Sequence, residues 1–139
     1  TLRPALARSL VPVRGQATAF AASGESAGLA VPVSRAGYVT PAIGGRHWAG
    51  GTAQRGEADT GQRAADDRAN AALIEALWPG AVAEPLDAFV AVRASTADRL
   101  PLVGALEPGL WVNAGHGAHG LMTAPLAGHR LARGILRHA

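Results

Sequence analysis

A short run rich in glycine and histidine near the C-terminus has the composition of a ligand-presenting turn. It lies between an apolar segment and a stretch with helical spacing, and it reads Gly115-His116-Gly117-Ala118-His119-Gly120. Glycines let a planar ligand lie against the backbone, and N–H groups at a helix start stabilise negative charge on that ligand. The same run is equally typical of a tight turn that needs positive φ. The residues alone leave both interpretations open.

Arg93 is a second candidate, at the end of a predicted strand and ahead of Ser95, Thr96, Asp98 and Arg99. An arginine at a strand end in a cleft can hold a carboxylate through two parallel hydrogen bonds. The pattern favours a structural role for Asp98, which can close the loop by bonding its backbone. Arg93 is therefore a candidate for binding a substrate carboxylate, with a purely structural role left open.

Other chemistries find little support in the sequence. His116 and His119 are three residues apart, and His47 and His129 add nitrogen ligands, but no acidic residue lies near any of them, so no metal site is predicted. The serines lack a G-x-S-x-G setting, and no G-x-x-x-x-G-K-[ST] loop is present. With no cysteine, disulfides and thiolate metal sites are excluded.

The first half of the chain is predicted to form short strands around one helix. Loosely alternating or β-rich segments separated by glycines predict an antiparallel meander at residues 10–20, 29–33, 38–40 and 43–48. Residues 52–63 are polar and predict a surface loop. Asp66 or Asp67 is predicted to cap a helix that reaches Trp78 and ends at Pro79-Gly80, with Leu73, Ile74, Leu77 and Trp78 on one face.

The second half is predicted to place one strand and one helix around the glycine turn. Residues 89–93 fit a strand, 94–108 a loop, and 110–114 a buried strand. A last helix is predicted over residues 120–137, with Leu121, Leu131, Ile135 and Leu136 facing inward and Arg130, Arg133 and Arg137 facing outward.

Composition limits the class of protein. The 139 residues suit one domain or a large part of one, but only 4% are aromatic, so the core is expected to be thin. The net charge of +3 comes from arginine and permits a polyanionic partner, although an arginine-rich surface explains it as well. No apolar run approaches the roughly 20 residues that span a membrane. We therefore expect a soluble cytoplasmic protein.

Several motifs follow one another in the order of a known family. They are Pro12-Val13-Arg14-Gly15-Gln16, Gly37-Tyr38-Val39-Thr40-Pro41-Ala42, Gly51-Thr52, Asp98-Arg99-Leu100-Pro101-Leu102-Val103-Gly104, Gly115-His116-Gly117, Gly120-Leu121 and Ala124-Pro125-Leu126. Together they resemble the D-amino-acid-oxidase-like FAD-dependent oxidoreductases over essentially the whole chain. Within that family the chain is most similar to the oxidoreductase half of bifunctional enzymes that modify the wobble uridine of tRNA.

The resemblance implies a mixed α+β and α/β fold, the later part of an FAD-dependent oxidoreductase. Residues 1–108 would supply strands, loop and helix of an antiparallel-sheet substrate domain, and residues 109–139 the closing strand, turn and C-terminal helix of a Rossmann-like FAD domain. Family members carry a G-x-G-x-x-G dinucleotide fingerprint near the start of the oxidoreductase region, and this chain lacks that fingerprint. We therefore expect a fragment or a degenerate copy that holds FAD poorly alone. Its expected partners are the missing N-terminal FAD-binding half, a fused methyltransferase domain and tRNA.

The resemblance also implies roles for the candidate residues. The cofactor is FAD, and the cofactor-binding positions are Gly115, His116, Gly117, Ala118, His119, Gly120 and Leu121. Arg93 would hold the substrate carboxylate. The tRNA enzymes usually have Ser-Arg in place of Ala118-His119, so His119 is a second substrate-binding candidate. Ala97 also stands where an arginine is common, which puts the strength of substrate binding in doubt.

The implied reaction is oxidation of a secondary amine. It would remove the carboxymethyl group of carboxymethylaminomethyl-(thio)uridine at the tRNA wobble position, through an imine that is hydrolysed to release glyoxylate. No catalytic side chain is required if the amine arrives deprotonated. The arginines at positions 46, 55, 63 and 68 slightly favour tRNA as the substrate.

Two alternatives remain. One is a stand-alone glycine, sarcosine or D-amino-acid oxidase. The other is a non-catalytic remnant or a basic RNA-binding module, for which the sequence offers few aromatic stacking residues.

Overall fold

The computed structural model describes residues 9–79 and 84–138, with side chains described to Leu136. The described chain falls into two compact units. The first, which we call the sheet unit, contains residues 14–54 and 59–92. The second, the hairpin unit, contains the described parts of residues 1–13, 55–58 and 93–139. We describe each unit by itself.

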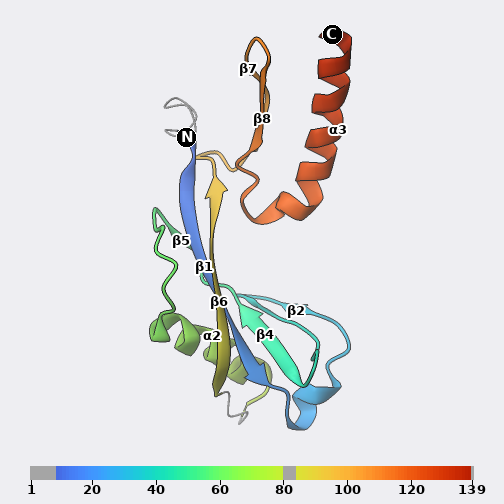
Figure 1. Ribbon diagram of the computed structural model, residues 1–139. Helices are drawn as coiled ribbons and strands as arrows, with labels where there is room; N and C mark the ends of the chain where they lie inside the picture. The colour runs from blue at the N-terminus through green and yellow to red at the C-terminus, as the bar shows by residue number, and fades with distance from the viewer. Residues whose placement is uncertain (1–8, 80–83, 139) are drawn as a thin grey trace. The chain divides into compact units, whose positions relative to one another are not determined.

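An antiparallel sheet dominates the first half of the chain (Figure 1). Its strands run in the order β2-β3-β4-β1-β5, with β6 also paired to β1. Their bounds are β1 Val11–Ala21, β2 Val33–Ser34, β3 Tyr38–Val39, β4 Arg46–Gly50, β5 Gln54–Arg55 and β6 Pro85–Ser95. β4 pairs antiparallel with β1, placing Thr18 opposite Ala49, and β3 pairs antiparallel with both β2 and β4.

The prediction of antiparallel strands is confirmed, but β1 pairs with β4 rather than with β2, so only β2, β3 and β4 form a meander, and β2 is shorter than expected. The segment predicted as a strand at residues 29–33 contributes only its end to β2, and the 3-10 helix η1 (Gly24–Gly28) comes before it. The loop predicted at residues 52–63 contains the short strand β5, so that prediction is wrong in part. Its side chains also take part in buried hydrogen bonds, described below.

One helix, α2 (Ala64–Leu77), completes the core of the sheet unit. Ile74 packs with Phe20, Val39 and Ala49, and a second set of half-buried residues surrounds them, namely Leu29, Ala71, Leu77 and Trp78. Each buried apolar side chain contributes roughly 1.5 to 3 kcal/mol, so a core of this size is small, as the composition predicted. The apolar face predicted for this helix is confirmed by Ile74, Leu77 and Trp78.

The predicted caps of α2 are wrong. Arg63 is the N-cap residue and makes no side-chain capping bond. Asp66 and Asp67 lie inside the first turn and are buried. Their carboxylates accept hydrogen bonds from buried side chains of β1. If the carboxylates bonded the helix backbone as caps instead, these buried donors would lose their partners.

The hairpin unit contains a two-stranded antiparallel sheet that the sequence did not fully predict. Strand β8 (Leu110–Ala114) pairs with β7 (Leu102–Glu107) around a turn in which Gly109 has a φ of +77°. The prediction of a loop over residues 94–108 is therefore wrong, because β7 lacks alternating polar residues that would have marked it. The prediction that β8 is buried is wrong too: a hairpin exposes much of its surface, and these residues are exposed or half-buried.

The C-terminal helix α3 (Gly120–His138) follows the 3-10 turn η2 (Gly117–His119) and packs on the hairpin. Small residues make this contact: Ala127 is buried, and Gly128 and Gly134 lie against Asn113 and Trp111. They allow the helix to approach the hairpin closely.

This contact contradicts the predicted inward face of α3. Leu121 and Leu136 are 99% and 78% exposed, Ile135 is 40% exposed, and Leu131 is half-buried. The glycines and Ala127 take the packing face, so the leucines lie outside it. Arg130 and Arg133 are exposed as predicted, while the Arg137 side chain lies outside the described residues. No helix in the described chain is long and apolar enough to span a membrane.

Candidate functional site

The glycine-rich turn joins β8 to α3 through two residues with positive φ. Gly115 has a φ of +76° and Gly117 a φ of +56°. Between them His116 adopts a helical conformation, and its carbonyl accepts a hydrogen bond from the His119 N–H at 3.1 Å. The chain thus enters α3 by way of a tight 3-10 turn. The first N–H groups of a helix have no carbonyl partner within it, so this end presents donors.

The turn lies against the segment Ser95-Thr96. A Cβ atom on Gly115 would lie 3.0 Å from the Thr96 γ-methyl and 3.0 Å from Leu10 Cδ2. Ser95 and His116 form an antiparallel bridge, and a Cβ on Gly117 would lie 3.4 Å from the Ser95 hydroxyl. Ser95 and Thr96 are both buried. At Gly115, therefore, both the conformation and the close approach require glycine.

The His116 side chain is held by its own neighbours. Its Nδ1 lies 2.7 Å from the Thr123 hydroxyl, and its Nε2 lies 2.7 Å from the Asn113 side-chain oxygen. Thr123 in turn donates to the His119 carbonyl at 2.9 Å. The imidazole fastens the turn to β8 and to the first turn of α3. Of the predicted cofactor-binding positions, His116 therefore offers a ligand its backbone rather than its ring.

The remaining positions of the turn face outward. Ala118, His119 and Leu121 are exposed and Gly120 is half-buried. Within the described residues the His119 ring makes no hydrogen bond. The exposed side of the turn therefore carries the side chains of Ala118, His119 and Leu121.

Arg93 lies on β6, two residues before Ser95, and its side chain is exposed. It makes no hydrogen bond or ion pair with any residue that the structure describes. Its guanidinium is therefore available to an outside carboxylate. Ala97 is also exposed and adds no charge.

The loop after Arg93 closes on itself, as the sequence predicts for Asp98. The Asp98 carboxylate accepts a hydrogen bond from the Leu100 N–H at 3.0 Å, and this bond holds the pKa of Asp98 below its usual value. The Thr96 hydroxyl donates to the Leu100 carbonyl at 2.7 Å. Between them Arg99 has a φ of +65°, which non-glycine residues seldom adopt. This loop is tightly constrained.

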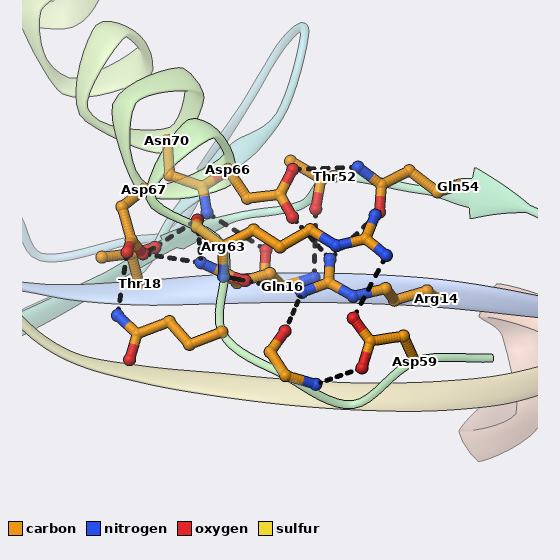
Figure 2. Close-up of polar contacts among 12 residues, drawn as sticks. Arg14, Gln16, Thr18, Thr52, Gln54, Asp59, Arg63, Asp66, Asp67 and Asn70 are labelled. Atoms are coloured by element: carbon orange, nitrogen blue, oxygen red, sulfur yellow. Dashed lines mark hydrogen bonds and ion pairs between the residues drawn. The ribbon is translucent and has the colours of Figure 1, made fainter. Parts of the chain in front are cut away.

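Sequence analysis missed a buried polar cluster in the sheet unit (Figure 2). Side chains from β1 and from α2 point toward one another and include Arg14, Gln16, Thr18, Asp66, Asp67 and Asn70, all of them buried. Arg14 donates to Asp66 and to Gln54, while Asp67 accepts from Thr18 at 2.6 Å and from Gln16 at 2.7 Å. Polar residues at alternate positions of a strand were the available signal. The cluster joins α2 to the sheet.

Two of the arginines that favoured tRNA also have partners inside the protein. Arg63 pairs with Asp59 and donates to Gln54, and Arg55 donates to the Thr96 carbonyl. Arg46 and Arg68 are exposed. The four arginines therefore do not act together as one free basic surface.

Comparison with known families decides the identity of the fold. The family of FAD dependent oxidoreductases (DAO) matches residues 1–133. The chain belongs to this family. The family predicted from the motif order and the α+β fold of an FAD-dependent oxidoreductase are both confirmed.

Two relatives among the FAD-dependent oxidoreductases are similar over most of the chain. They are the tRNA 5-methylaminomethyl-2-thiouridine biosynthesis bifunctional proteins MnmC of Chromobacterium violaceum, 36% identical, and Thiobacillus denitrificans, 41% identical. The alignments cover 88% and 86% of this chain but only 24% and 21% of those proteins. The chain thus spans less than a quarter of the length of these relatives.

Solved structures of the same fold are also similar. Glycine oxidase from Geobacillus kaustophilus is 27% identical with a TM-score of 0.75, over 89% of this chain and 34% of that one. Glycine oxidase from Bacillus cereus, 23% identical with a TM-score of 0.72, shares the fold over 88% of this chain and 35% of its own.

Residues 115–120 happen to fit the letters G-x-G-x-x-G, but they are not the dinucleotide fingerprint of an FAD-dependent oxidoreductase. That fingerprint requires a parallel βαβ unit and an acidic residue about 20 positions further on. Here the preceding strand β8 belongs to an antiparallel hairpin rather than to a parallel βαβ unit. We therefore do not expect this turn to bind the ribose or the pyrophosphate of a cofactor.

Proposed function

We propose that this chain supplies the substrate-binding strands and the flavin-contacting turn of an FAD-dependent amine oxidase that acts on modified wobble uridine in tRNA. The observation that carries the proposal is identity of 36% and 41%, over most of the chain, with proteins named for tRNA 5-methylaminomethyl-2-thiouridine biosynthesis. The reaction would remove the carboxymethyl group from carboxymethylaminomethyl-(thio)uridine.

The turn fits an FAD ring at its outer side. Ala118 is exposed and adds only a methyl group, while a Cβ atom on Gly115 or Gly117 would face Thr96 or Ser95 rather than a ligand. N–H groups at the start of α3, other than that of His119, which donates to the His116 carbonyl, would point to the pyrimidine edge of the ring, where donors stabilise developing negative charge. Bound FAD would accept the hydride from the carbon beside the substrate amine. The turn would hold that acceptor in place.

Arg93 would orient the substrate. Its exposed guanidinium has the fork geometry that binds a carboxylate through two hydrogen bonds, and the carboxymethyl group supplies one. His119 is a second contact for the same anionic group. Neither residue removes a proton in this scheme, because a deprotonated amine needs no side-chain base. Water then hydrolyses the imine to the uridine amine and glyoxylate.

The exposed face of α3 would bind the N-terminal FAD-binding half. Leu121, Met122, Leu126 and Leu136 are exposed on a helix whose other face already packs on the hairpin. An apolar surface of this kind on a single helix indicates a further contact. The division into residues 1–108 and 109–139 remains a proposal of the same kind, as do a fused methyltransferase domain and residence in the cytoplasm.

The test is to express the chain together with the coding region upstream of it and to record the visible spectrum. We expect bound flavin that is bleached in the absence of oxygen by tRNA carrying the carboxymethylaminomethyl group, and not by glycine. A protein that never binds flavin would refute the proposal.

A stand-alone amino-acid oxidase is the second candidate. The similarity to glycine oxidase, with a TM-score of 0.75, favours it. Bleaching by glycine or sarcosine but not by tRNA would establish it in place of the tRNA activity. Binding of tRNA without flavin would instead indicate an RNA-binding remnant.

A further inference from the structure

We propose that Arg55 is a positioning residue for the glycine turn and that it acts through Thr96. The part of this inference that concerns flavin rests on the proposed function. The contact itself lies within the hairpin unit and is independent of any cofactor.

Arg55 is fixed at both its backbone and its side chain. Its Nη2 donates to the Thr96 carbonyl at 2.9 Å, and the N–H of the next residue, Gly56, donates to the Pro12 carbonyl at 2.8 Å. The peptide that carries the arginine is thus tied to the start of β1. The guanidinium can hold the Thr96 carbonyl in one position.

Thr96 is held from two sides and bears directly on the turn. Its carbonyl accepts from Arg55, its hydroxyl donates to the Leu100 carbonyl, and the residue is only 4% exposed. A Cβ atom on Gly115 would lie 3.0 Å from the γ-methyl of Thr96, which is closer than an ordinary van der Waals contact. A shift of Thr96 would therefore displace Gly115.

The same segment carries both proposed contacts of the reaction. Ser95 bridges to His116 in the turn, and Arg93 precedes Ser95 by two residues on β6. Loss of the bond from Arg55 to Thr96 would therefore disturb the flavin-contacting turn and the carboxylate-binding arginine together. A residue that merely stabilised the fold would have no such selective effect.

The first experiment needs no cofactor. Amide hydrogen exchange is measured on the 139-residue chain for the wild type, Arg55→Ala, Arg55→Lys and Arg46→Ala. Arg46 is the matched control, an exposed arginine of the sheet unit. We expect exchange at residues 115–119 to become about tenfold faster in Arg55→Ala, as loss of one hydrogen bond allows, with partial recovery in Arg55→Lys and no change in α2. Unchanged exchange in the turn would overturn the proposal.

A pair of Thr96 variants separates the two contacts of that residue. Thr96→Ser removes the methyl group against Gly115 and keeps the hydroxyl, whereas Thr96→Val does the reverse. We expect faster exchange in the turn for Thr96→Ser, and for Thr96→Val faster exchange only near Leu100. The opposite pattern would contradict transmission through the methyl group.

The second experiment uses the chain expressed with its upstream region and compares the same arginine variants. In Arg55→Ala we expect flavin to bind about tenfold more weakly, its reduction potential to fall, and KM for the amine substrate to rise, with flavin binding and the reduction potential unchanged in Arg46→Ala. A wild type that binds no flavin would refute the proposed function and leave the exchange result standing. A wild type that binds flavin, with Arg55→Ala indistinguishable from it, would overturn the inference alone. A change confined to KM for tRNA, with normal exchange, would show that Arg55 is an RNA contact instead.

Discussion

At the scale of single residues, Arg93 is the side chain that we propose binds the substrate carboxylate. It is exposed and has no partner in the described part of the chain, so its substitution should leave the fold intact. In the flavin-loaded protein we expect Arg93→Ala to raise KM strongly for a carboxylate substrate. The rise corresponds to a loss of about 2 to 5 kcal/mol of binding free energy if the pair of arginine and carboxylate is desolvated. Arg93→Lys should also be impaired, since a lysine lacks the guanidinium fork. An unchanged KM in steady-state assays would remove Arg93 from the site.

Gly115 tests the requirement for glycine in the turn. We expect Gly115→Ala to destabilise the chain by more than the roughly 1 to 2 kcal/mol of a left-handed conformation, because its Cβ would also meet Thr96 and Leu10. Gly109→Ala is the matched control, with a φ of +77° and no atom within 4 Å of a Cβ. Urea unfolding of both variants gives the difference. Equal losses in the free energy of unfolding of the two variants would show that the neighbours of Gly115 accommodate a Cβ atom at no cost in stability.

Asp67 should make stability depend on pH. Burial raises the pKa of Asp67, but hydrogen bonds from Thr18, Gln62 and Gln16 outweigh it, so the pKa lies below the usual 3.8. A lowered pKa means that the stabilisation is complete above the unfolded value and is lost as the pH falls through the folded value. We expect the free energy of unfolding to decline from about pH 4 downward, and less steeply in Asp67→Asn. Glu75→Gln, an exposed change on the same helix, should follow the wild type.

At the scale of elements, the buried polar cluster fixes α2 to β1. Arg14 is fully buried and paired with Asp66, and its Nε has no partner in the described structure. Removing one member of a buried ion pair leaves the other charge uncompensated, at a cost of about 3 to 5 kcal/mol. We expect Arg14→Met to lose this much by urea unfolding and Arg46→Met, an exposed control, to lose little. Similar losses in the free energy of unfolding for both variants would show that the buried ion pair stabilises the fold no more than a surface arginine does.

Sequence patterns predicted those elements whose apolar residues or glycines indicate where they lie in the fold. Ile74 and Trp78 mark the inner face of α2, and the ordered glycine motifs gave the family. Strand β7 was missed because its run of small and apolar residues has no polar alternation. The leucines of α3 were misplaced because glycine, which carries no hydrophobic signal, makes the helix contact.

The candidate site was predictable only in part, for the same reason. Glycine itself marks the turn, but nothing near Arg55 in the sequence indicates a bond to Thr96, 41 positions away. Asp66 and Asp67 look like caps from local spacing alone. Their true partners lie on a strand about 50 residues earlier. Long-range polar contacts leave no local pattern.

At the scale of the whole molecule, we propose that the outer face of α3 binds an FAD-binding half. We expect the double change Leu121→Glu and Leu136→Glu to leave the melting temperature of the isolated chain nearly unchanged, because both side chains are exposed. The same change should abolish co-purification with a separately expressed FAD-binding half. Ile43→Glu, at another exposed apolar position, is the control. Equal loss in the control would indicate a general effect on solubility.

The packing of Gly134 against Trp111 gives the hairpin unit its own optical reporter. The chain has three tryptophans, and the other two, Trp48 and Trp78, lie in the sheet unit. Replacing those two with phenylalanine would leave fluorescence that arises from the hairpin and helix alone. Separation of α3 from the hairpin would expose the indole to water and shift its emission to the red. The two units could then be followed independently as denaturant is added, which would reveal whether they unfold in one step or in two.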